Sequence, residues 1–156
     1  MPVTGFEQFE VGQKFTSAPR AVTTADIKQF AAQFDFQPQH MDETAAKATL
    51  FGSLVASGWH TASLTMRLML ESILEGVSGR GLGIRINDIT WSSPVRPDDE
   101  LHAVSEVMSL RPSRSKPDRG LAVIRTTTHN QRGEAVQEMT GTLLILRSDA
   151  LLHLGN

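Results

Sequence analysis

The sequence predicts a single α+β domain in which an antiparallel sheet wraps around one long buried helix. Apolar residues recur at helical spacing between residues 23 and 76, whereas they alternate at strand spacing from residue 82 onward. Helices early in a chain and strands late in it are typical of an α+β fold rather than of an alternating parallel sheet. A chain of 156 residues fits one domain, which at this size buries about 70% of its unfolded surface. We therefore expect one domain over residues 1–156, with its core from about 10 to 147.

The N-terminal part predicts a strand and a first helix. Residues 15–22 have the composition of a strand, and Pro19 indicates an edge or a bulge within it. Thr23 or Thr24 offers an N-cap for a helix that runs to about residue 34. The expected apolar face of this helix consists of Ile27, Phe30, Ala31 and Phe34.

Two further helices are predicted after a loop over residues 35–41. Asp42 can cap a short helix over residues 43–48. The longest helix is expected from Gly58 to about residue 74, ending near Gly76. We expect it to be mostly buried through a broad apolar face that comprises Trp59, Ala62, Met66, Met69, Leu70 and Ile73.

The C-terminal half predicts four consecutive antiparallel strands. Their alternating segments are residues 82–90, 101–109, 121–129 and 136–146. Gly133 can take the positive φ that the turn between the last two strands needs. Because one helix cannot cover both faces and the edges of such a sheet, we expect a side-by-side dimer.

Composition and charge exclude several classes of function. The chain has no cysteine, which excludes disulfides, cysteine-ligated zinc and thiol nucleophiles and is compatible with a cytoplasmic location. The net charge of -2 provides no global positive field to attract nucleic acid. The sequence shows neither a signal peptide nor an apolar run of about 18 residues, so we expect no membrane as a partner.

The stretch most informative about function is Asp35-Phe36-Gln37-Pro38-Gln39-His40, followed by Ala56-Ser57-Gly58. It places a carboxylate and an imidazole five residues apart on a segment stiffened by proline. A histidine exchanges protons near neutral pH. The free N–H groups of a helix N-terminus, where Gly58 stands, stabilise negative charge. This combination suits adding water to, or removing it from, a substrate with a polarised carbonyl.

These residues lie within a wider pattern. Asp35-x-Gln37-Pro38-x-His40 resembles the D-x-N-P-x-H signature of the MaoC-like enoyl-CoA hydratases and dehydratases, which have a hot-dog fold. The family's continuation is matched by Met41-Asp42-Glu43-x-Ala45-Ala46, Phe51-Gly52, Ala56-x-Gly58 and Pro94-Val95-Arg96-Pro97-x-Asp99. The sequence departs from the family where Gln37 replaces Asn, Ser57 replaces a common His and Asp98 replaces Gly. The resemblance covers about residues 10–146.

The resemblance implies the hydration or dehydration of an enoyl thioester. Asp35 and His40 would activate one water, and the N–H of Gly58 would polarise the thioester carbonyl. Contacts to the water from one side would give syn addition. The family implies no metal, flavin or nucleotide redox cofactor, and coenzyme A would be the carrier of an acyl-CoA substrate. A homodimer or higher homo-oligomer is expected.

Further residues are candidates for binding the substrate, namely Gln37, Ser57, Trp59, Arg96, Arg114 and Lys116. Gln37 either braces the loop or faces solvent. Ser57 either caps the long helix or bonds near the water. Arg96 and the two basic residues of the 111–120 loop are candidate contacts for the phosphates of coenzyme A. The alternative for that loop is an ordinary solvated connection.

Bulky side chains near the expected site predict a preference for short or compact acyl groups. They are Phe34, Phe36, Phe51 and Trp59. The pair Met66 and Met69 is expected to fill the core, and its alternative role is to flank an acyl tunnel.

Two other functions remain open on the same architecture. A thioesterase would use Asp35 to direct water at the carbonyl carbon, and it would release thiol from a saturated acyl-CoA. A non-catalytic acyl-CoA-binding protein would have lost turnover through the changes at Gln37 and Ser57. His60 either lines the site or lies in the core, and the core is favoured.

Overall fold

A computed structural model describes residues 2–153 of the chain, with side-chain environments given as far as residue 150. The elements follow the predicted order, with helices first and long strands afterwards. They are η1 (Phe6–Gln8), β1 (Lys14–Thr16), β2 (Arg20–Ala21), α1 (Thr24–Phe34), α2 (Pro38–Met41), α3 (Glu43–Ala46), α4 (Gly58–Leu70), η2 (Glu75–Val77), β3 (Gly81–Trp91), β4 (Glu100–Pro112), β5 (Arg119–His129), β6 (Ala135–Leu146) and η3 (Ser148–His153).

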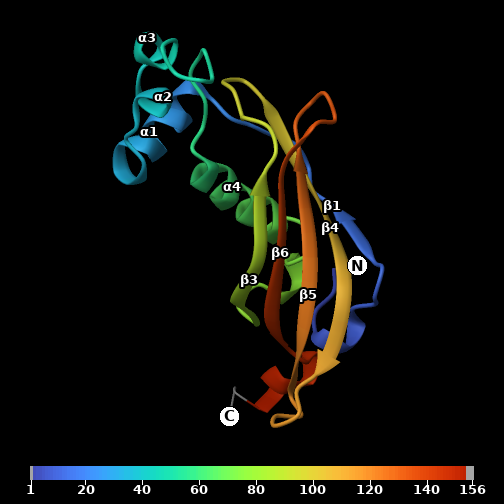
Figure 1. The fold of residues 1–156 in the computed structure, drawn as a ribbon. Coiled ribbons are helices and arrows are strands. Elements are labelled where there is room, and N and C mark those ends of the chain that lie inside the picture. Colours follow the sequence, from blue (N-terminus) through green and yellow to red (C-terminus); the bar gives the residue numbers. More distant parts are fainter. Residues whose placement is uncertain (1, 154–156) are drawn as a thin grey trace.

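One antiparallel sheet forms the body of the molecule. Its strands lie in the order β1-β4-β5-β6-β3, and β2 pairs with the start of β4. Figure 1 shows α4 lying against the sheet, with its N-terminal end toward the group formed by α1, α2 and α3. This arrangement confirms the predicted α+β fold of a sheet around one long helix.

The strand that the sequence places before the first helix is interrupted. Residues 14–16 and 20–21 pair separately with β4, as β1 and β2, on either side of Pro19. The bulge expected at the proline is therefore a complete break.

Local capping signals correctly predicted where α1 and α3 begin. Thr23 caps α1 through a capping box, in which its side chain accepts from Asp26 N and the Asp26 carboxylate accepts from Thr23 N. The Asp42 side chain accepts from Ala45 N at 2.7 Å and caps α3. Both caps satisfy backbone N–H groups that a helix start leaves free.

The predicted apolar face of the long helix is wrong in part, because α4 turns a different side to the sheet. Trp59, Met66 and Leu70 are exposed, whereas Thr61 and Thr65 are buried together with Leu68 and Met69. The polar face of the sheet explains the exchange: Thr65 meets the side chains of Thr128 and Gln137 there. The helix also ends at Leu70, earlier than expected.

The strand β3 is the exposed edge of the sheet. It pairs only with β6 within the described part of the chain, and Leu82, Ile84 and Ile86 are more than half exposed. The alternation of its residues predicted one buried face. In the structure no residue of β3 is buried, although its last residue, Trp91, packs against the start of α4.

None of the helices within residues 2–153 is long and apolar enough to cross a bilayer.

Candidate active site

The segment between α1 and α3 brings Asp35 and His40 together. Asp35 ends α1, with its N–H bonded to Ala31 O at 2.9 Å. Gln37 is the N-cap of α2 and Pro38 occupies its first position, where a missing N–H costs nothing. The sequence predicted a loop here, but residues 38–41 form one helical turn. This turn carries His40 back toward the carboxylate of Asp35.

His40 is buried, and both of its ring nitrogens have defined neighbours. Nδ1 lies 2.6 Å from Val55 O. Because a carbonyl only accepts, this contact places a proton on Nδ1. In the neutral ring Nε2 is then the free base, and it lies 3.4 Å from Oδ2 of Asp35. Two acceptors so arranged leave a position from which one water can donate to both.

The Asp35 carboxylate is held by two neutral donors. Gln37 Nε2 donates to Oδ1 at 2.6 Å, and Ser57 Oγ donates to Oδ2 at 2.7 Å. Burial opposes ionisation of this carboxyl, but the two hydrogen bonds and the charge of His40 outweigh it and lower its pKa below the usual value of 3.8. Gln37 therefore braces the segment although its own side chain is exposed.

The N-terminus of α4 faces the same place. Ser57 is its N-cap, as predicted, and accepts from Trp59 N at 3.2 Å while donating to Asp35. No hydrogen bond formed by the described residues uses the N–H of Gly58. This N–H is thus a free donor at the positive end of the helix, beside the paired carboxylate and imidazole.

Position 58 requires glycine because the side chain of Trp91 lies very close to its backbone. A β-carbon added there would lie 2.7 Å from Cε2 of Trp91, on the last residue of β3. The sequence explained this glycine by access for the substrate; the structure adds the indole ring as a second reason. Trp91 is the residue of the site that sequence reasoning missed.

These groups line a cleft of about 450 Å³. Asp35, His40 and Gly58 line it together with Trp91 and Trp59, which form an aromatic wall with ring centroids 5.3 Å apart in an edge-to-face arrangement. Phe51 also lines the cleft, in accordance with the sequence, whereas Phe34 and Phe36 do not line it and are exposed.

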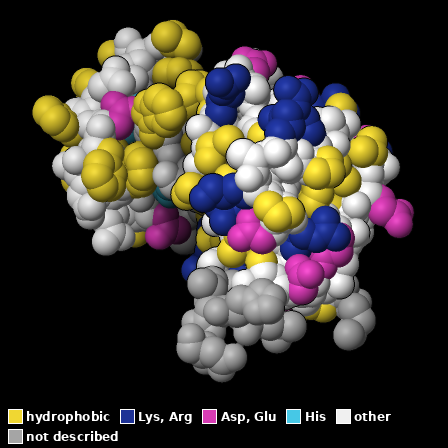
Figure 2. Space-filling model, turned by 90° about the horizontal axis from the view of Figure 1, so that it is seen from below, with side chains coloured by type: hydrophobic (Ala, Val, Ile, Leu, Met, Phe, Trp, Pro, Cys, Tyr) yellow, Lys and Arg dark blue, Asp and Glu magenta, His cyan; other side chains and the backbone are white. Residues whose placement is uncertain are grey.

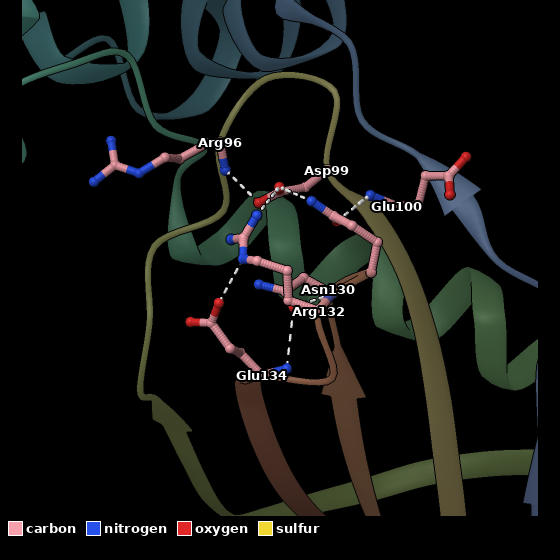
Figure 3. A network of polar contacts seen from close by, with 7 residues as sticks. Arg96, Asp99, Glu100, Asn130, Arg132 and Glu134 are labelled. Carbon is pink, nitrogen blue, oxygen red and sulfur yellow. Dashed lines mark hydrogen bonds and ion pairs between the residues drawn. The ribbon is translucent and has the colours of Figure 1, made fainter.

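The segment after β3 completes the wall and is fixed by Asp99, which is buried. The Asp99 carboxylate accepts from the backbone N–H of Arg96 and from Gln131 Nε2, each at 2.9 Å, and Arg132 lies 3.9 Å away. Figure 3 shows this network joining the segment to the turn between β5 and β6. Val95 O then accepts from Ala56 N at 2.8 Å, just before α4.

Asp98 and Arg96 have structural roles in this segment. Asp98 has φ 68°, a left-handed conformation that favours Gly and is tolerated by Asp. The guanidinium of Arg96 points away from Asp99 (Figure 3) and donates to Ser53 Oγ and, at 3.4 Å, to Phe51 O. Arg96 thus ties two walls of the cleft together, and its contact with a phosphate stays a prediction.

The structure does not bring Arg114 and Lys116 to this cleft. They follow the end of β4, whose 13 residues start beside the cleft and extend about 40 Å away from it. Figure 2 looks at the molecule from below, the end where this loop lies in Figure 1, and shows basic side chains interspersed with acidic ones. Within one chain the two residues are too far from Asp35 to share its ligand, so a phosphate role for them stays a prediction that needs a second copy.

His60 faces away from this cleft, on the other side of α4, but it is half-buried beside a second cleft and does not lie in the core that the sequence favoured. It stacks on Phe30 with ring centroids 4.9 Å apart and an angle of 7°. Both residues line a second cleft of about 350 Å³ together with Arg20 and Asp26. Burial lowers the pKa of His60. Among the described residues, no group of three or more His, Asp or Glu side chains is placed to hold a metal ion.

Comparison with known proteins identifies the wider group to which this geometry belongs. The model of the MaoC-like domain matches residues 7–130. The uncharacterised protein YdeM of Bacillus subtilis is 34% identical over 143 residues, covering 90% of this chain and 98% of YdeM. The (R)-specific enoyl-CoA hydratase of Aeromonas caviae is 30% identical over 128 residues, covering 81% and 88% of the two chains.

Solved structures that superimpose on this chain indicate the same family as the sequence relatives. The crystal structure of a MaoC-like dehydratase from Rhodospirillum rubrum superimposes with a TM-score of 0.86 at 45% identity, covering 92% of this chain and 97% of the other. The (R)-hydratase of A. caviae gives a TM-score of 0.72 at 28% identity, covering 88% and 97%. The fold is therefore the hot-dog fold of these proteins.

Proposed function

Because the chain belongs to the MaoC-like domain family, we propose that it adds water across, or removes water from, the 2,3 double bond of an enoyl thioester. The observation that carries the proposal is the convergence of three groups on one cleft. They are the Asp35 carboxylate, the free Nε2 of His40 and the unbonded N–H of Gly58. A hydratase needs these three functions: a base, a proton carrier and a donor for the developing enolate.

In the proposed reaction one water donates hydrogen bonds to Asp35 Oδ2 and His40 Nε2. Its oxygen forms a bond to C3 while one of its protons passes to the pair, and C2 receives a proton from the same pair. The π electrons move onto the thioester oxygen, where the N–H of Gly58 stabilises the charge. The 3.4 Å separation of the two acceptors supports delivery of both parts of water to one face, and hence syn addition.

The ionisation of Asp35 supports this role at neutral pH. Its two hydrogen bonds and the nearby imidazole lower the pKa of the carboxyl despite burial. The carboxylate therefore remains an acceptor for the water, and it stabilises the imidazolium that forms when His40 takes up a proton.

The proposed substrate is an acyl-CoA with a short or compact acyl group. The similarity to the (R)-specific enoyl-CoA hydratase of A. caviae supports coenzyme A as the carrier. Phe51, Trp59 and Trp91 narrow the cleft beside the reacting groups. A separate cavity of about 70 Å³ lies between α4 and the sheet. Met66 and Met69 line it together with Met139, which supports the alternative that the two α4 methionines flank the acyl chain.

A homodimer is part of the proposal, because β3 leaves both its backbone edge and its side chains uncovered. Leu82 is 62% exposed, and Ile84 and Ile86 are 51% and 56% exposed. Exposed apolar residues of α4, Met66 and Leu70, extend the uncovered apolar surface. A second copy paired at β3 would satisfy the strand edge and cover this surface. Light scattering after size-exclusion chromatography tests the dimer, which Ile84→Lys should dissociate.

The decisive experiment compares two thioesters with the wild-type protein. We expect loss of enoyl absorbance on crotonyl-CoA and no release of thiol from butyryl-CoA, because a saturated chain offers no double bond to hydrate. Thiol release from butyryl-CoA would instead establish a thioesterase. Stabilisation by either thioester without turnover would establish a binding protein, since saturation at 100 times the dissociation constant adds about 2.7 kcal/mol.

A further inference from the structure

A continuous chain of buried polar side chains runs from the centre of the sheet to the wall of the cleft. Trp91 Nε1 donates to Gln137 Oε1 at 2.9 Å, and Gln137 Nε2 donates to Thr65 Oγ1 at 3.1 Å. Thr65 Oγ1 lies 2.7 Å from Thr128 Oγ1. Gln137, Thr65 and Thr128 are each 0% exposed. Such a chain is costly in a core unless every member finds a partner.

The positions of these residues follow from the strand register. Trp91 on β3 is the cross-strand partner of Gln137 on β6, which in turn is the partner of Thr128 on β5. The three side chains therefore form one row across the sheet, and Thr65 of α4 lies over that row. Because β3 is an edge strand, this row adds a side-chain link to the core at the end of β3, beside the backbone pairing with β6.

The orientation of the Gln137 amide is fixed by chemistry. An indole N–H only donates, so the amide oxygen must face Trp91. Its NH₂ group is then left for Thr65, whose hydroxyl can accept it and donate to Thr128. An apolar side chain of the same size would fill the space at position 137 but would leave the indole without its acceptor.

The Trp91 ring held in this way lies directly over Gly58. The contact is so close that a β-carbon at Gly58 would be 2.7 Å from Cε2 and 2.9 Å from Cδ2 of the ring. Trp91 also lines the cleft with Asp35 and His40, and 41% of its surface is exposed. The ring position thus sets the space beside the free N–H of Gly58.

We propose that Trp91 is a substrate-contacting wall residue at the thioester carbonyl, and that Gln137 is a positioning residue that acts through the indole N–H. The inference rests on the proposed function for the identity of the ligand. The central claim is that an acyl thioester packs against the Trp91 ring, which Gln137 holds in place. A binding measurement without turnover can test this claim.

The test compares Gln137→Met with a matched control, Thr128→Val. Both changes remove a buried polar group from the same row, but only the first takes away the acceptor of Trp91. We expect Gln137→Met to lower kcat/KM for crotonyl-CoA about fivefold to tenfold, the range of one lost hydrogen bond. Thr128→Val should change it by less than about twofold, although thermal unfolding should report a loss of stability for both.

A second readout is the emission of Trp91 itself. The chain has two tryptophans, so a Trp59→Phe background leaves Trp91 as the only one. Butyryl-CoA, which has no double bond to hydrate, should change its emission in a saturable titration, and Gln137→Met in that background should weaken the titration. If the Trp59→Phe protein hydrates crotonyl-CoA but its Trp91 emission does not change with butyryl-CoA, the wall assignment is overturned and the proposed function stands.

The remaining outcomes are equally decisive. Equal losses of kcat/KM in Gln137→Met and Thr128→Val would show that the row only supports the core, and would overturn the positioning role. A saturable Trp91 signal in a protein that hydrates no enoyl-CoA would support the wall and overturn the proposed activity. A protein that neither hydrates crotonyl-CoA nor shows the signal would overturn both.

Discussion

The two clefts on either side of α4 each contain a histidine, but the two imidazoles have different surroundings. His40 has Nδ1 committed to Val55 O and Nε2 facing the carboxylate of Asp35. His60 stacks on Phe30, and its buried Nδ1 has no hydrogen-bond partner among the described residues. The difference teaches that a cleft and an imidazole are insufficient. In the proposed reaction, a defined tautomer and a carboxylate that faces the free ring nitrogen make His40 the base.

The largest effect should come from removing either member of the His40 pair. Asp35→Asn and His40→Gln should each lower kcat/KM for crotonyl-CoA at least about 100-fold, because the amide that each introduces cannot take up a proton from the reacting water. His60→Gln, the matched change in the other cleft, should alter kcat/KM less than about twofold. A comparable loss in His60→Gln would contradict the distinction between the two clefts.

The next largest effect should follow from Gly58→Ala. The added methyl group would collide with the Trp91 ring, so we expect a loss of about tenfold in kcat/KM and an overpacking cost of about 1–3 kcal/mol in the free energy of unfolding. Steady-state kinetics measures the loss in kcat/KM, and urea denaturation measures the change in the free energy of unfolding. Trp91→Phe in the same chain should restore part of the stability; an unchanged deficit in the double variant would place the cause elsewhere.

Ser57→Ala separates capping from catalysis. Loss of the N-cap should cost about 1 kcal/mol of stability. Loss of the hydrogen bond to Asp35 should raise the pKa of that carboxyl, so the acidic limb of the kcat/KM profile should move to higher pH. Thr23→Ala removes the cap of α1 and serves as the control. If Thr23→Ala moves the acidic limb of the pH profile as far as Ser57→Ala does, the movement reflects lost stability and not the pKa of Asp35.

The smallest effect concerns the pH dependence of stability. Burial lowers the pKa of His60 below its usual value of 6.5, so the unfolded chain binds a proton first as the pH falls. The stabilisation from the neutral ring is complete above pH 6.5 and is lost below it. His60→Gln should therefore flatten the fall in urea midpoint between pH 7.5 and 5.5. Burial and the nearby His102 also lower the pKa of His129, so this residue should preserve part of the pH dependence of the urea midpoint. An unchanged slope would mean that His60 is equally easy to protonate in both states.

Features with a local signal were predictable from the sequence. The caps at Thr23 and Asp42, the turn at Gly133 and the three central strands depend on a few neighbouring residues, and the structure has them in place. The proximity of Asp35 and His40 was also accessible, because five residues and a proline leave the segment few conformations.

Features that depend on pairing between distant segments were not predictable. The exposure of Trp59 and the burial of Thr65 follow from which side of α4 meets Gln137, a residue 72 positions later in the chain. Trp91 reaches Gly58 only through the register of β3 with β6. The separation of Arg114 and Lys116 from the cleft likewise follows from the length of β4. The composition of the loop that carries them gives no information about that length.

The position of β3 beside β6 has a consequence for how the chain assembles during synthesis. β3 is made before β4 and β5, yet the strand that pairs with it is the last one of the sheet. In a ribosome-bound chain the apolar residues of β3 therefore stay unpaired until about residue 146 has emerged. Long-range closure of this kind slows folding and exposes an unpaired strand to neighbours. We expect the nascent chain to depend on chaperone protection over this interval, with the wall of the cleft forming only when β6 arrives.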